Sequence, residues 1–193
     1  MKITMSFILA ALILVGSSFQ TATDHSLARA NRINVKWVFY HCEPVSNYEI
    51  AFTFKNIIHN YNCNTIERNI DETLKNANQE AGLQNKLYDA IITGTADRDL
   101  AVVFTDKTKD NSTARVKKED GKYIFLSCEP LTEYAILKKV DVSGEVKMMM
   151  LGGKCPTQQE KIDKLLKQGD KKKSACDAVI RGDSKYDLLI KFK

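Results

Sequence analysis

Short β-rich segments separated by turn residues recur through most of this chain, and this pattern limits its fold more than any other feature. Residues 35–40 are β-branched and aromatic, and residues 61–70 and 186–192 also have a strand-like pattern. Five further strand candidates follow one another at residues 87–95, 100–105, 122–128, 133–140 and 145–151. Such regular spacing is typical of antiparallel hairpins and not of alternating strand–helix units, so we expect an all-β domain.

One amphipathic helix is well signalled near the end of the chain. Thr157 and Glu160 have the spacing of a capping box, in which each side chain accepts a hydrogen bond from the backbone amide of the other residue. Ile162, Leu165 and Leu166 then share one helical face. Residues 48–58 fit either a strand or a short helix, residues 73–83 are polar without a clear pattern, and no internal repeat is apparent.

The amino terminus indicates export. Met1 and Lys2 precede an apolar run, residues 3–15, and a short stretch of small and polar residues, which is the pattern of a secretory signal peptide. The run is shorter than the roughly 20 apolar residues that span a bilayer. We therefore expect residues 1–20 to be a signal peptide and residues 21–193 to form one secreted domain. The 29 Lys and Arg residues are too evenly matched by 24 Asp and Glu residues for a dedicated nucleic-acid-binding protein.

Export also determines how the five cysteines of the chain are interpreted. They are Cys42, Cys63, Cys128, Cys155 and Cys176. In an exported protein we expect disulfide partners more than catalytic thiols, and an odd number allows at most two bridges within the chain. No Cys-x-x-Cys spacing occurs, so neither a zinc ribbon nor a thioredoxin-like motif is indicated.

A signal peptide, about eight strands in hairpin order and a late helix are arranged as in an up-and-down barrel with a helix outside it. Over roughly residues 33–176 the chain resembles the lipocalin family, diverged as in invertebrate salivary or bilin-binding branches. The segments that carry the resemblance are residues 35–37, 92–96, 100–104, 123–126, 133–137 and 146–151, followed by the helix at Thr157. Val35 stands where the family's G-x-W motif has its glycine. The resemblance implies an eight-stranded antiparallel up-and-down barrel with one C-terminal α-helix packed outside.

The resemblance also implies a cavity and a set of disulfides. Alternate residues on the strands would line the cavity, namely Trp37, Phe39, Tyr123, Phe125, Tyr134, Ile136, Met148 and Met150, although the same pattern fits an ordinary core. The implied bridges are Cys63 with Cys176 and Cys128 with Cys155. Pairing of Cys42 with Cys128 or Cys155 remains an alternative. His59 is the residue that could ligate haem in such a barrel, but no cofactor or metal is expected.

The function implied is that of a secreted, non-catalytic protein that binds or sequesters a small hydrophobic or amphipathic ligand. No nucleic-acid partner and no membrane span after signal cleavage are expected. The alternative is an antagonist that binds a host protease, platelet receptor or integrin through surface loops. Arg181, Gly182 and Asp183 form an adhesion-type tripeptide for that role, although they also suit an ordinary turn.

A glycosylation sequon and the lack of common catalytic motifs agree with this hypothesis. Asn111 begins an N-x-T sequon in a polar loop, which predicts N-linked glycosylation of an exported chain. The G-x-S-x-G, G-x-G-x-x-G and P-loop patterns do not occur, so neither hydrolysis nor nucleotide chemistry is indicated.

Overall fold

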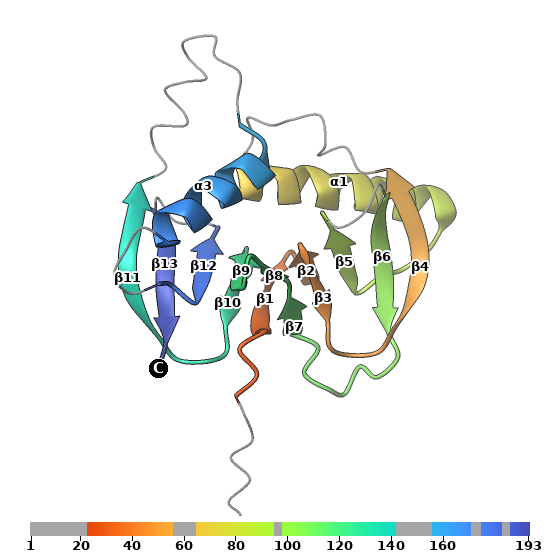
Figure 1. Cartoon of the computed structure of the whole chain (residues 1–193). Coiled ribbons are helices and arrows are strands. Elements are labelled where there is room, and N and C mark those ends of the chain that lie inside the picture. The colour runs from red at the N-terminus through yellow and green to blue at the C-terminus, as the bar shows by residue number, and fades with distance from the viewer. Residues whose placement is uncertain (1–22, 56–64, 95–97, 142–155, 171–174, 183–185) are drawn as a thin grey trace, which may run out of the picture.

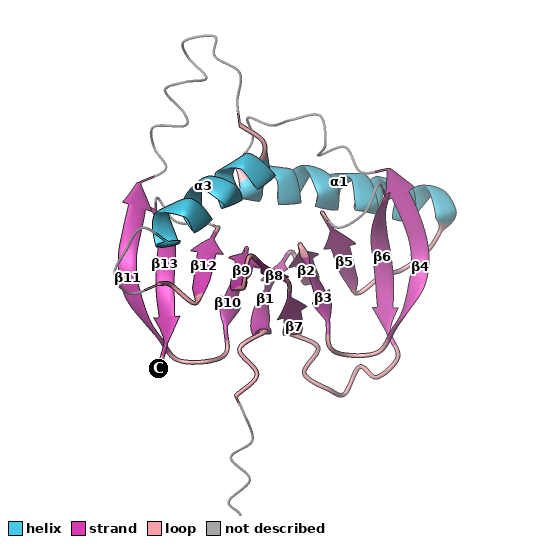
Figure 2. Ribbon diagram, in the orientation of Figure 1, coloured by secondary structure: helices cyan, strands magenta, loops and turns pink. Residues whose placement is uncertain are grey.

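The structure is a computed structural model that describes residues 23–55, 65–94, 98–141, 156–170, 175–182 and 186–193 (Figure 1). The predicted signal peptide and the strand predicted at residues 145–151 lie outside these ranges. Strands curl into a half-barrel, and two helices lie across its open side (Figure 2). None of the helices in the described ranges has the length and apolar character needed to cross a bilayer.

The strands confirm that the chain is rich in β structure. They are β1 (Leu27–Ile33), β2 (Lys36–Tyr40), β3 (Cys42–Pro44), β4 (Tyr48–Lys55), β5 (Ala90–Thr93), β6 (Arg98–Phe104), β7 (Thr113–Val116), β8 (Lys118–Glu119), β9 (Lys122–Leu126), β10 (Cys128–Pro130), β11 (Tyr134–Asp141), β12 (Ala178–Arg181) and β13 (Tyr186–Phe192). The helices are α1 (Ile66–Gln84) and α3 (Gln158–Asp170). The predicted capping box of α3 is confirmed, because the Glu160 amide donates to the Thr157 hydroxyl at 3.1 Å and the Thr157 amide donates to the Glu160 carboxylate at 2.6 Å.

Helix α1 replaces the strand predicted at residues 61–70, so that prediction is wrong from residue 65 onward. Thr65 caps the helix, since its hydroxyl accepts a hydrogen bond from the Arg68 amide at 3.2 Å. Ile66, Ile70 and Leu74 recur every four residues and are buried on one face. The helical period was not recognised from the sequence because the buried face also contains polar residues.

The chain consists of two halves with the same topology, so the expectation of no internal repeat is wrong. In each half one strand pairs in parallel with the strand that follows the helix. These pairs are β2 with β5 in the first half and β9 with β12 in the second half. Two antiparallel neighbours extend each pair, which gives the order β2–β5–β6–β4 within an eight-stranded sheet and the order β9–β12–β13–β11 within a five-stranded sheet. The tripeptide Cys42–Pro44, which forms β3, recurs as Cys128–Pro130, which forms β10.

This strand order differs from the predicted barrel. In an up-and-down barrel every strand is antiparallel to its sequence neighbour, whereas β2 and β5 are parallel and need a crossover, which contains α1. The described residues also contain two helices where one was predicted. The halves are interlocked instead of forming one cylinder, because β1 pairs with β7 and β10 of the second half and β3 pairs with β7.

Two apolar clusters lie on the two sides of the strands. The first cluster joins the helices to the sheet and includes Phe54, Ile70, Leu126 and Leu165. The second cluster lies on the opposite faces of the same strands and includes Phe39, Phe104, Phe125, Cys42 and Cys128. Alternation along β2 and β9 produces this division, since successive side chains of a strand point to opposite faces.

The turn between β1 and β2 offers a first prediction. Asn34 and Val35 have φ angles of 48° and 62°, and the equivalent Asp120 and Gly121 have φ angles of 47° and 77°. Such two-residue turns favour glycine, and a β-branched residue is strained there. Val35 is 75% exposed, so its side chain contributes little packing. Val35→Gly should therefore raise the free energy of unfolding by about 1 kcal/mol, measured by urea denaturation.

The matched control exchanges the same residues at the other turn. Gly121→Val should lower the free energy of unfolding by about 1 kcal/mol or more, because it introduces the strain that Val35 carries. Equal stability of both variants and the parent protein would contradict the proposed strain.

Candidate ligand-binding site

Five of the residues predicted to line one cavity lie together on the face of the strands opposite the helices. Trp37, Phe39, Tyr123, Phe125 and Tyr134 belong to or pack against the second cluster, which faces away from the helices. Ile136 is 48% exposed, and Met148 and Met150 lie outside the described residues. Their role as the lining of one cavity stays a prediction, and Trp37 lines a pocket at the surface.

A pocket with a volume of about 180 Å³ opens beside Trp37. It lies between the β1–β2 turn, the residue before β5, the end of β6 and the loop that follows β6. Its lining residues are Arg32, Val35, Lys36, Trp37, Asp89, Phe104, Lys107 and Asn111. The volume is below the roughly 300 Å³ at which drug-sized sites begin, so the pocket suits a molecule about the size of one ring with a short substituent.

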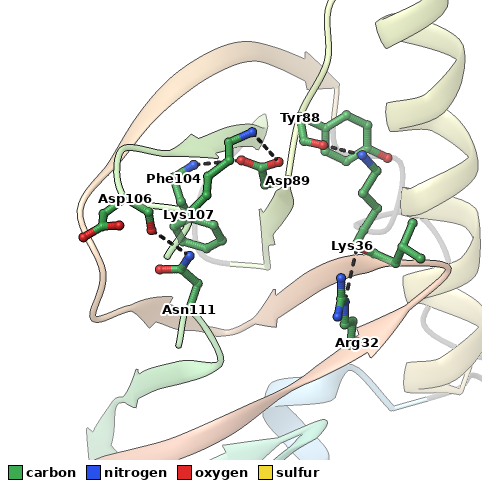
Figure 3. Close-up of polar contacts among 9 residues, drawn as sticks. Arg32, Lys36, Tyr88, Asp89, Phe104, Asp106, Lys107 and Asn111 are labelled. Carbon is green, nitrogen blue, oxygen red and sulfur yellow. Dashed lines mark hydrogen bonds and ion pairs between the residues drawn. The ribbon is translucent and has the colours of Figure 1, made fainter. Parts of the chain in front are cut away.

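Asp89 organises one wall of this pocket. Its Oδ2 accepts a hydrogen bond from the Phe104 amide at 3.1 Å, and its Oδ1 accepts one from Lys107 Nζ at 3.2 Å (Figure 3). The ion pair with Lys107 is largely exposed, so it contributes little to stability. Its effect is to place the ammonium group of Lys107 at the rim of the pocket.

Two further cations lie on aromatic rings. The Arg32 guanidinium carbon is 5.2 Å from the centroid of the Trp37 ring, and Lys36 Nζ is 4.2 Å from that of the Tyr88 ring. Lys36 Nζ also donates to the Tyr88 carbonyl oxygen, as Figure 3 shows. Burial raises the pKa of Tyr88, which therefore stays neutral. Three cationic side chains and one carboxylate line the pocket, an excess of positive charge that favours an anionic ligand.

Asn111, the predicted glycosylation site, forms another part of the lining. It is 7% exposed, and its Nδ2 donates to the Asp106 carbonyl oxygen at 3.0 Å (Figure 3). A hydrogen bond from the Thr108 hydroxyl is the main cause that lowers the pKa of Asp106, and it helps to hold this loop. The Asn111 Oδ1 is buried and accepts no hydrogen bond from the described residues. A ligand with an N–H or O–H group could satisfy it, while glycosylation of Asn111 stays a prediction.

Arg181 of the adhesion-type tripeptide is buried, whereas that prediction required an exposed arginine. The Arg181 side chain is only 8% exposed, and its guanidinium lies 3.5 Å from Oδ2 of the buried Asp187. A receptor would need an exposed arginine, so the prediction for Arg181 is wrong. Gly182 lies directly after β12 against the backbone of Ser127, and Asp183 lies outside the described residues.

Among the described residues, Cys42, Cys128 and Cys176 are buried thiols and no disulfide joins them, so the structure decides none of the predicted pairings. Cys42 and Cys128 are both buried, and their thiols are in hydrogen-bond contact. That contact, followed by burial, raises the pKa of Cys128. Cys176 is also buried, whereas Cys63 and Cys155 lie outside the described residues. The pairings of Cys63 with Cys176 and of Cys128 with Cys155 therefore stay predictions.

The sequence identified Trp37 as a ligand-binding candidate. It did not identify Asp89 or the three cations Arg32, Lys36 and Lys107 as members of the pocket. The signals for Trp37 were the single tryptophan and the alternation along β2. A signal for the remainder was present in the repeated Lys–aromatic pair, Lys36-Trp37 and Lys122-Tyr123, but only the common topology shows that these pairs are equivalent.

Within the described ranges, no three His, Cys, Asp or Glu side chains come together as a metal site requires. The pocket combines aromatic side chains, cations, one carboxylate and the buried Oδ1 acceptor of Asn111. No protein-family model, curated protein or solved structure matches this chain.

Proposed function

We propose that the protein is a secreted, non-catalytic binding protein that takes a small amphipathic anion in the Trp37 pocket. The observation that carries this proposal is the pocket itself, with Trp37 and Phe104 as apolar walls and Arg32, Lys36 and Lys107 as an excess of cations. The proposal keeps the carrier function that the lipocalin resemblance implied. It moves the ligand from the centre of a barrel to the edge of a half-barrel.

The energetics agree with modest affinity. Burial of apolar ligand surface is worth about 25 cal/mol per Å², and the ordering of the ligand and the desolvation of its anionic group oppose it. A pocket of about 180 Å³ limits the area that can be buried. We therefore expect dissociation constants on the order of micromolar to millimolar for single-ring ligands.

Trp37 is the only tryptophan of the chain, so its fluorescence reports directly on the pocket. Titration with phenylacetate should change this fluorescence in a saturable way, whereas phenethylamine, which has the same ring with an ammonium group, should have little effect. The double variant Arg32→Gln/Lys107→Gln should bind phenylacetate about tenfold more weakly, because about 1.4 kcal/mol of charge interaction is lost. Lys139→Gln, which removes an exposed cation of β11 in the other half, is the matched control and should bind like the parent protein.

A fluorescence response to neither ligand would contradict the proposal and make surface-loop antagonism the hypothesis to test. An equal loss of affinity in the Lys139→Gln control would show that the net charge matters and not the pocket.

A further inference from the structure

His25, which precedes β1 of the first half, packs against the second half, and Asn111, which precedes β7 of the second half, takes the equivalent position against the first half. Each residue lies within a tight turn made by a preceding aspartate. Asp24 Oδ1 accepts a hydrogen bond from the Ser26 amide at 3.0 Å, and Asp110 Oδ1 accepts one from the Ser112 amide at 2.9 Å. The antiparallel pairing of β1 with β7 relates these two turns to each other, with Ala28 opposite Ala114.

The walls around His25 and Asn111 are also equivalent. Trp37 of β2 lies opposite Ala90 of β5, as Tyr123 of β9 lies opposite Ala178 of β12. The Phe104 amide donates to Asp89, as the Phe192 amide donates to Asp177 at 3.0 Å. Arg32 lies over the Trp37 ring, and Lys118 Nζ lies 4.9 Å from the centroid of the Tyr123 ring. Both halves therefore carry equivalent aromatic walls, an equivalent aspartate and a cation over the aromatic ring, whereas Lys107 has no counterpart in the second half.

In the second half this group of side chains is filled by His25, which the first half contributes. The His25 ring stacks on Phe192, with centroids 4.3 Å apart and an angle of 11° between the planes. It also lies edge-on to Tyr123 at 6.5 Å. At the equivalent position against the first half, Asn111 has no ring, and a pocket lies beside Phe104 and Trp37. His25 thus shows which shape of group these walls accept.

We propose that the Trp37 pocket binds a planar aromatic ring that carries an anionic group, with the ring lying beside Trp37 and Phe104 as His25 lies beside Tyr123 and Phe192. This inference rests on the proposed function and names its ligand class. Offset or parallel stacking on an aromatic wall favours a flat ring over a saturated one. The anionic group would lie among Arg32, Lys36 and Lys107, and a ring hydroxyl or N–H would satisfy the Asn111 Oδ1.

Two reciprocal substitutions test this inference by isothermal titration calorimetry with 4-hydroxyphenylacetate on the mature secreted chain. The parent protein should bind one equivalent. Asn111→His should place an imidazole in the pocket and weaken binding at least tenfold. His25→Asn should empty the equivalent position in the second half and yield a second site, so that the protein binds two equivalents. The second half accommodates a histidine at the equivalent position, so Asn111→His is expected to fold.

Ligand controls separate this inference from the proposed function. Cyclohexylacetate has the same charge without a flat ring and should bind about tenfold more weakly, while tyramine, which has the ring and an ammonium group, should not bind. Equal binding of cyclohexylacetate would overturn the planar-ring inference and leave the proposed function standing. Unchanged binding by Asn111→His would overturn both. A single equivalent bound by His25→Asn would show that the two positions are not interchangeable and would overturn the inference alone.

A different observation supports a second inference. Cys42 begins β3 and Cys128 begins β10, and each of these strands pairs with a strand from the other half. The two thiols are buried in the second cluster and lie in hydrogen-bond contact. Two equivalent cysteines therefore meet where the halves interlock.

We infer that Cys42 and Cys128 form a disulfide in the exported protein. The oxidant is the disulfide of a thiol oxidoreductase or of oxidised glutathione. One cysteine thiolate attacks that disulfide and releases one thiol. The second thiolate then attacks the resulting mixed disulfide and releases the other. The two cysteines lose two electrons and two protons, and the oxidant is reduced to two thiols.

Digestion of secreted protein without reduction, followed by mass spectrometry, should reveal one linked peptide pair that contains Cys42 and Cys128 and separates on reduction. In the Cys42→Ser variant, Cys128 should instead react with an alkylating agent after denaturation. Recovery of either residue as an alkylated thiol in the unreduced parent protein, or its linkage to another cysteine, would overturn the inference.

Discussion

Arg181→Leu should lower the free energy of unfolding by about 3 to 5 kcal/mol, as measured by urea denaturation followed by circular dichroism. The Arg181 and Asp187 side chains are 8% and 3% exposed, and they lie on the paired strands β12 and β13. The substitution leaves the Asp187 carboxylate buried without this cation. A charge in that position is costly because the surrounding protein cannot solvate it as water does.

A double variant separates the loss of the pair from damage to packing. Arg181→Leu/Asp187→Leu removes both charges and should recover most of the lost stability, because apolar replacement of a buried ion pair is often close to neutral. Arg115→Leu is the matched surface control. Arg115 pairs with Asp24 at 3.0 Å, but its side chain is 58% exposed, so the cost should stay below about 1 kcal/mol. A double variant as unstable as Arg181→Leu would contradict this account of the pair.

Phe54→Ala should have an effect of similar size, a loss of about 3 to 5 kcal/mol in the free energy of unfolding. Phe54 is 2% exposed on β4 and belongs to the cluster between the sheet and the helices. Removing its ring leaves a cavity and forfeits contacts with neighbours that include Phe52, whose ring centroid is 6.1 Å away. The measurement is again urea denaturation, with the midpoint expected to fall and the slope to stay unchanged.

The same strand supplies the control for this prediction. Ile50 is 56% exposed on β4, so Ile50→Ala should change the free energy of unfolding by less than about 1 kcal/mol. Equal losses in the free energy of unfolding would contradict the placement of Phe54 on the buried face of β4 and of Ile50 on its exposed face.

Local signals account for the parts of the fold that the sequence predicted. Strand β2 has alternating β-branched and aromatic residues, and the cap of α3 depends on residues three positions apart. Helix α1 was missed because its buried face contains Asn69 and Thr73, which read as solvent-exposed positions in a sequence. Burial of these polar residues depends on tertiary contacts, and the Thr73 hydroxyl bonds to the Asn69 carbonyl oxygen at 2.9 Å within the helix.

The same division holds for the site. Trp37 was recognisable as a candidate from its own strand. Asp89 and Lys107 are more than fifty positions away along the chain, and they reach Trp37 because β5 pairs in parallel with β2 and antiparallel with β6. A contact of this kind has no local pattern, since it depends on which strands become neighbours.

By itself the sequence determined that the chain is rich in strands and that a capped helix begins at Thr157. Only the tertiary structure decided that two equivalent halves interlock and that one half has an open pocket where the other holds His25. The physical reason is that capping and alternation act between near neighbours. Strand order and pocket shape instead arise from pairing and packing between segments far apart in the chain.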